Sequence, residues 1–169
     1  MKAVRAAIED NLPSAKTILN ALNNPIYKMY LLFLAYVFEL VIKVNVELQS
    51  ESPKLPFLLN RITTLYKKLL RSFKKKDVLD KTRIHKVNIN CPGNYVIIEN
   101  LYVGAKTDAF IKLKNENIAK EELHNFRVRI LDLYAEICYQ IKKRFDLNDS
   151  HLKYASNFTP NIALYGSVW

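Results

Sequence analysis

Apolar residues recur at steps of three and four along most of this chain, which is the spacing of one face of an α-helix. Two short helices are expected at the start, over residues 3–11 and 13–23, and Pro13 suits the first position of the second one. After Pro25, no proline or glycine interrupts the chain as far as Gln49. This stretch therefore predicts one long helix.

Two more amphipathic helices are expected further along the chain. The first begins at Pro53 or Leu55 and ends at Lys75, and its apolar stripe consists of Leu55, Leu58, Leu59, Ile62, Leu65, Tyr66, Leu69, Leu70 and Phe73. The second covers residues 117–147, and its stripe consists of Leu123, Phe126, Ile130, Tyr134, Ile137, Ile141 and Phe145. In this last helix acidic residues come early and basic residues come late, which is the order that the helix dipole favours.

The periodic pattern lapses between Asp77 and Gly104. In this interval "NINCPGNY" contains a Pro-Gly turn, and "YVII" suits a short extended piece. A brief helix is expected over residues 105–113, and no element is evident after Asn148. The expected fold class is therefore all-α: a helical bundle of two or three long helices plus short helices, with an irregular or short extended segment near 84–104.

Length and composition fit one domain of this kind. The chain has 169 residues, and half of them are hydrophobic, which is enough to bury a core. It has only three glycines, which argues against a β-sandwich and against a glycine-rich phosphate-binding fold. We expect three parts: short N-terminal helices over 1–24, a helical domain over 25–147 and an irregular C-terminal tail over 148–169.

The first long helix is apolar enough to raise the question of a membrane span, which needs roughly 20 mostly apolar residues. Glu39 would lie near the middle of the bilayer, where an acidic residue costs about 2.5–3.5 kcal/mol. Glu39, Lys43 and Glu47 are also i,i+4 neighbours, as on a solvated helix face. We therefore expect a mostly buried helix and no membrane, with a protein partner covering the remaining apolar surface. A membrane span is the alternative.

Positive charge is concentrated in one part of the chain. Ten of its Lys and Arg residues lie between Arg61 and Lys86 against only Asp77 and Asp80, so this block carries +8 of the total net charge of +10. Such a block predicts an anionic partner, and Lys/Arg contacts to DNA phosphates are sequence-independent and salt-sensitive. The candidate nucleic-acid-binding residues are Lys67, Lys68, Arg71, Lys74, Lys75 and Lys76. The alternative is a solvated helix face and loop without a ligand.

The sequence lacks the usual patterns of catalytic and metal-binding residues. Cys91 and Cys138 are far apart, and His85, His124 and His151 lack the spacing of metal ligands. No nucleophile elbow, phosphate-binding loop or dinucleotide fingerprint occurs. We therefore expect no catalytic activity, no metal and no cofactor. The first 16 residues lack the apolar core of a secretory signal, so an intracellular location is expected.

Two blocks of the sequence resemble the hAT superfamily of transposases and the zinc-finger-like host proteins derived from them. In the first block, a long helix ends in the phrase N-x-x-x-Q-S-E-x-P, formed by Asn45, Gln49, Ser50, Glu51 and Pro53. The second block is similar to the family's F-R-x-R-x-x-D-F-Y-x-x-x-x-x-Q-I-x-K-R-F helix through Phe126, Arg127, Arg129, Asp132, Tyr134, Gln140, Lys143, Arg144 and Phe145. Between them, "IENLYVGAK" is similar to a short link in the family. The resemblance covers roughly residues 20–150.

The resemblance implies a helical insertion domain, which in these transposases separates the second from the third catalytic acid of an RNase H-like core. The catalytic acids have no matching positions in this chain, and the single tryptophan, Trp169, lies outside both blocks. The expected function is a non-catalytic nuclear domain that contacts DNA or a transposase core. A helical protein–protein interaction module without a nucleic-acid role is the alternative.

Overall fold

The computed structural model describes residues 13–49, 55–114, 116 and 118–155. Within these ranges the chain forms helices, 3₁₀ turns and loops without any strand, so the prediction of an all-α fold is confirmed. The first of the expected short helices, over 3–11, lies outside the described residues.

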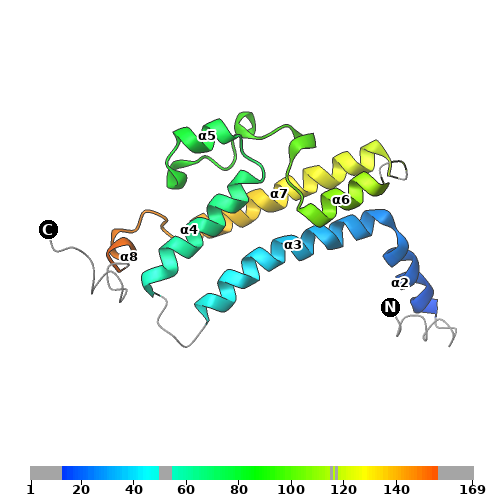
Figure 1. Ribbon diagram of the computed structural model, residues 1–169, viewed down its shortest axis with the longest axis horizontal. Helices are drawn as coiled ribbons and strands as arrows, with labels where there is room; N and C mark the ends of the chain where they lie inside the picture. The colour runs from blue at the N-terminus through cyan, green and yellow to red at the C-terminus, as the bar shows by residue number, and fades with distance from the viewer. Residues whose placement is uncertain (1–12, 50–54, 115, 117, 156–169) are drawn as a thin grey trace.

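Three long helices make the body of the molecule: α3 (Pro25–Leu48), α4 (Leu55–Arg71) and α7 (Lys120–Arg144). In Figure 1, α3 and α4 run in opposite directions, and α4 lies against α7. Between α3 and α4, Nε of Arg61 is 3.1 Å from Oε2 of Glu47. Because both side chains are partly solvated, this ion pair contributes little stability, and the apolar faces hold the helices together.

A cluster of aromatic rings joins the long helices in the centre of the core. Phe33 of α3 packs edge-on against Phe126 and Tyr134 of α7, with the ring centroids 6.3 and 5.4 Å apart. Phe73, just after α4, stacks on Tyr134 with the centroids 6.0 Å apart. All four side chains are buried. The core is therefore built where the apolar stripes of the three helices meet.

Helix α4 ends at Arg71, four residues earlier than the apolar stripe predicts. The stripe continues to the buried Phe73, but the backbone there bonds to a distant segment. The carbonyl of Phe73 accepts a hydrogen bond from the amide of Val96 at 2.9 Å, and that of Ser72 accepts one from the amide of Tyr102 at 3.1 Å. Tertiary hydrogen bonds thus replace the next helical turn.

The segment between α4 and the helix that begins at Ala105 is more ordered than the sequence pattern indicates. It contains a short helix that was not expected, α5 (Lys76–Lys81), followed by three 3₁₀ turns. These are η1 (Ile84–Lys86), η2 (Pro92–Asn94) and η3 (Ile98–Asn100). The expected extended piece "YVII" is reduced to an isolated antiparallel bridge between Lys74 and Tyr95.

Three shorter helices pack on the long ones. Helix α2 (Pro13–Asn23) and helix α6 (Ala105–Lys114) lie against α3, and both agree with the expected elements. Helix α8 (Ser150–Ala155) lies against α4. The prediction of an irregular chain after Asn148 is therefore wrong for these six residues, because six residues are too few to show a helical period.

Helix α3 is buried along one face only. Met29, Phe33 and Val37 are its fully buried positions, and 17% of its most apolar stretch is buried. By length and composition alone, α3 qualifies as a possible membrane-spanning helix. The prediction of a mostly buried helix is wrong, because α4 and α6 pack on one side of α3 and leave the opposite side open.

Candidate nucleic-acid interface

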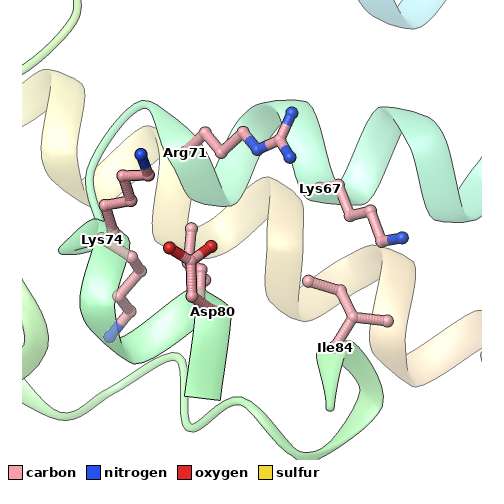
Figure 2. A pocket seen from close by; sticks show the side chains of 7 residues that line it. Lys67, Arg71, Lys74, Asp80 and Ile84 are labelled. Atoms are coloured by element: carbon pink, nitrogen blue, oxygen red, sulfur yellow. The ribbon is translucent and has the colours of Figure 1, made fainter. Parts of the chain in front are cut away.

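The basic block folds around a hollow between α4 and α5. The hollow has a volume of about 610 Å³ and is open to solvent. Figure 2 shows side chains from both helices around it. They are Lys67, Arg71, Lys74, Lys76, Leu79, Asp80 and Ile84. We refer to this hollow as the basic groove.

Helical spacing explains why the cations of α4 share this groove. Lys67 and Arg71 are four residues apart, so they project from one side of the helix, next to the stripe that is buried in the core. Lys76, the first residue of α5, adds another basic side chain to the groove. Asp80 is the single acidic residue of the lining, and within the described residues its carboxylate forms no ion pair. The groove therefore has an excess of positive charge.

The six predicted nucleic-acid-binding residues do not share one surface. Lys67, Arg71 and Lys76 are exposed and line the groove together. Lys68 is exposed on α4 but does not line it. Lys75 lines a neighbouring open hollow and donates a hydrogen bond from Nζ to the carbonyl of Gly93 at 2.8 Å. Three of the six thus form the charged wall of the groove.

Lys74 is placed differently from the other five. Its side chain is only 2% exposed, and Nζ donates a hydrogen bond to the carbonyl of Cys91 at 3.3 Å. The same ammonium lies 4.1 Å from the ring centroid of Tyr95. Burial lowers the pKa of Lys74 to about 8. The prediction that Lys74 offers its charge to a phosphate does not fit this position, since its ammonium contacts groups of the protein itself.

The groove shares lining residues with a second hollow of about 470 Å³, which adds Arg, Lys and His side chains that were not in the predicted set. Lys67 lines both hollows. Arg83 and His85, around η1, and Lys153, on α8, line the second one. Arg83 belongs to the basic block, so the sequence could have identified it as a candidate binding residue. Lys153 gave no signal in the sequence, because only the packing of α8 on α4 brings it near.

The residues of the first family block lie at the end of α3. Oδ1 of Asn45 accepts a hydrogen bond from Nε2 of Gln49 at 3.4 Å, and both residues are exposed. Ser50, Glu51 and Pro53 lie outside the described residues. Gln49 is also the C-cap residue of α3, because its backbone amide donates a hydrogen bond to the carbonyl of Asn45, and neither residue lines the basic groove.

The residues of the second family block are divided between the core and the surface of α7. Phe126 and Tyr134 are buried, and the hydroxyl of Tyr134 donates a hydrogen bond to the carbonyl of Tyr102 at 2.9 Å. Nε of Arg127 is buried and has no hydrogen-bond partner in the part of the chain that is described. The remaining positions are exposed or half-buried, and they are Arg129, Asp132, Gln140, Lys143, Arg144 and Phe145. They do not line the basic groove either.

Among the residues with described positions, no group of three His, Cys, Asp or Glu side chains is arranged to hold a metal ion. Cys138 is buried in the core, where burial raises the pKa of its thiol to about 12, and Cys91 is half-buried. The basic groove, whose lining carries four basic side chains and one carboxylate, is therefore the candidate site.

Comparisons of the chain with protein-family models, with curated proteins and with solved structures found no match.

Proposed function

We propose that this chain is a non-catalytic helical domain, derived from an hAT-like transposase, that contacts the phosphate backbone of DNA through the basic groove. The observation that carries the proposal is the convergence of Lys67, Arg71 and Lys76 on one open hollow, with Asp80 as the single acid in its lining. Cations at fixed spacing on a rigid helix pair suit a row of phosphates.

The lining favours backbone contact over base recognition. Its polar side chains are amino, guanidinium and carboxylate groups, and its apolar side chains are the aliphatic Leu79 and Ile84. Arg and Lys can contact guanine as well as phosphate, but the lining contains no amide side chain to pair with adenine and no aromatic ring on which a base could stack. The proposed binding is therefore independent of DNA sequence and sensitive to salt.

Neutralising the groove tests the proposal. We expect the Lys67→Gln, Arg71→Gln, Lys76→Gln triple variant to bind a short DNA duplex at least about tenfold more weakly, because about three phosphate contacts are lost. The slope of log affinity against log salt should become shallower by about 2–3 for the same reason. Fluorescence anisotropy of a labelled duplex over a salt series measures both quantities.

A matched control separates the groove from the net charge. The Lys106→Gln, Lys114→Gln, Lys120→Gln variant also loses three exposed cations, from α6 and the start of α7, and should keep most of the affinity. Equal weakening of the two variants, or no binding by the natural chain at low salt, contradicts the groove as the site. Metal-dependent nicking of the duplex by the purified chain contradicts the absence of catalysis.

A second candidate function is a helical protein–protein interaction module, and the exposed apolar side of α3 favours it. Phe38 and Ile42 are large apolar side chains of α3 that are more than half exposed. In this alternative the substitutions in the basic groove leave binding of the protein partner unchanged, and the natural chain has no measurable affinity for DNA. The salt series described above distinguishes the two candidates.

A further inference from the structure

Helix α3 carries a stripe of exposed apolar side chains on the side that faces away from the bundle. Its five large members are each between 52% and 60% exposed, and the smaller Ala35 is exposed among them. We name this surface the outer stripe, and it consists of Tyr27, Leu31, Ala35, Phe38, Ile42 and Val46. A continuous apolar patch of this length on a soluble protein indicates an interaction surface.

The spacing of the outer stripe is the same when it is read in either direction. From Tyr27 to Val46 the steps are 4, 4, 3, 4 and 4 residues. The centre of this pattern lies between Tyr36 and Val37. A two-fold axis through that point, perpendicular to α3, places the outer stripe of one chain opposite the outer stripe of another chain that runs antiparallel to it.

We propose that the outer stripe binds a second copy of this chain, as an antiparallel pair of α3 helices. Under the two-fold axis Leu31 faces Ile42 of the second copy, and Tyr27 faces Val46 of the second copy. At the centre Phe38 faces Ala35, which is the only small side chain of the stripe. The largest central side chain therefore meets the smallest one, as in knobs-into-holes packing.

The polar residues of α3 are compatible with this pairing. Glu39 and Lys43 are exposed beside the six positions of the outer stripe, whereas Lys28 and Asn45 lie about five turns from Val46 and Tyr27 and so share its face near the two ends. Lys28 is also held over the ring of Phe110, with Nζ 5.0 Å from the ring centroid. No charged side chain is therefore buried at the centre of the pair, which avoids the cost of desolvating one.

The size of the surface predicts a weak dimer. The outer stripe extends over 20 residues of helix, or about 30 Å. Pairing of two such stripes buries on the order of 1,000 Å² in total, which is the lower limit for a specific interface. We therefore expect monomers and dimers to interconvert with concentration.

A lipid bilayer fits the outer stripe less well than a second copy does. Insertion of α3 would require the buried Met29, Phe33 and Val37 to leave the core, and would bring Glu39 and Lys43 into the apolar layer. The pairing of two copies leaves the bundle intact and covers only the side that is exposed.

Self-association of the full chain tests the proposal directly. We expect sedimentation equilibrium of the natural chain to show a dimer at high concentration that dissociates on dilution. The Phe38→Gln, Ile42→Gln variant should associate at least about tenfold more weakly. Both positions are exposed, so the helical circular dichroism signal should be unchanged. A natural chain that stays monomeric at all concentrations, or a variant that dimerises equally well, overturns the proposal.

Disulfide cross-linking tests the antiparallel geometry. In a background with Cys91→Ser, we expect a mixture of Leu31→Cys and Ile42→Cys chains to form cross-linked heterodimers on mild oxidation. Neither variant alone should cross-link, because the two-fold axis places position 31 opposite position 42. Cross-linking of the Leu31→Cys chain with itself indicates parallel helices and overturns the proposal.

Two further controls keep this inference separate from the function proposed above. The triple variant of the basic groove should still dimerise, so loss of DNA binding and loss of self-association are distinguishable. Neutral phosphatidylcholine vesicles test whether the outer stripe binds a lipid bilayer instead of a second copy. Vesicle binding by the natural chain that is lost in the Phe38→Gln, Ile42→Gln variant indicates a membrane surface and overturns the proposal.

Discussion

At the scale of single residues, two fully buried tyrosines differ in what their hydroxyl groups contact. The hydroxyl of Tyr134 donates a hydrogen bond to the carbonyl of Tyr102 at 2.9 Å. The hydroxyl of Tyr66 is also buried, but it has no partner within the described residues. Burial raises the pKa of both phenols. The apolar stripes predicted that both rings lie in the core, but the helical period has no bearing on where a hydroxyl group bonds.

This difference gives opposite expectations for removing the two hydroxyl groups. Tyr134→Phe should lower the free energy of unfolding by about 1–2 kcal/mol, because it leaves the backbone carbonyl of Tyr102 without its donor. Tyr66→Phe should leave that free energy unchanged or raise it by up to about 1 kcal/mol, since an unsatisfied polar atom is removed. Urea unfolding measures both. Equal losses in the two variants contradict the hydrogen-bond assignment.

Lys74 shows the same limit of sequence reasoning in a charged residue. It lies in the middle of the basic block, and nothing in the local pattern distinguishes it from its neighbours. The backbone bridge to Tyr95 and the hydrogen bond from its ammonium to the carbonyl of Cys91 hold its side chain against the 84–104 segment. Its burial therefore depends on contacts between residues that are far apart in the chain.

The lowered pKa of Lys74 predicts a pH dependence of stability. The pKa is about 8 in the folded chain against an ordinary value of 10.5, so the unfolded chain binds more protons between these values. The free energy of unfolding should therefore rise by about 1–3 kcal/mol, relative to a Lys74→Met variant, as pH increases from about 8 to about 10.5. Urea titrations at several pH values measure this difference.

The comparison with Lys74→Met cancels the titratable groups that do not interact with Lys74. The measured difference also includes any change in the titration of Cys138, whose thiol interacts with the ammonium of Lys74. Lys75→Met removes an exposed lysine next to it and serves as the control. A pH-independent difference between the natural chain and Lys74→Met would show that the ammonium is not buried.

At the scale of elements, Gly104 determines how α6 lies against α3. Its φ is +87°, a value that L side chains rarely adopt. A Cβ at this position would also come within 2.8 Å of the Tyr36 ring on α3. The backbone therefore passes directly over that ring before α6 begins.

We expect Gly104→Ala to destabilise the chain by about 2 kcal/mol or more, because both the backbone strain and the clash with Tyr36 oppose it. Gly93→Ala is a matched control, since a Cβ there has no atom within 4 Å. Thermal unfolding followed by circular dichroism compares the two variants. Similar losses for both would contradict the close approach at Gly104.

At the scale of the whole molecule, the two proposed surfaces face different directions. The basic groove lies between α4 and α5, and the outer stripe runs along the open side of α3. Figure 1 places α5 and α3 on opposite sides of α4. An antiparallel pair of α3 helices would therefore leave both grooves accessible. Two grooves on one dimer would strengthen binding to a long duplex through effective concentration, provided that the spacing fits the DNA.

By itself, the sequence determined the class of the fold and the course of the long helices. The bounds expected for α2, α3 and α6 agree with the structure to within one residue, and α7 is shorter than its expected range by three residues at each end. Helical periodicity and proline positions depend on neighbours within a few residues, so these features can be derived locally.

The tertiary structure alone decided which side chains meet and which stay exposed. It ended α4 at Arg71 by giving its backbone distant partners, buried Lys74 and brought Lys76 beside Lys67 and Arg71. It also left the outer stripe of α3 uncovered. Each of these outcomes depends on residues that are distant in the chain, and the period of a single helix holds no information about them.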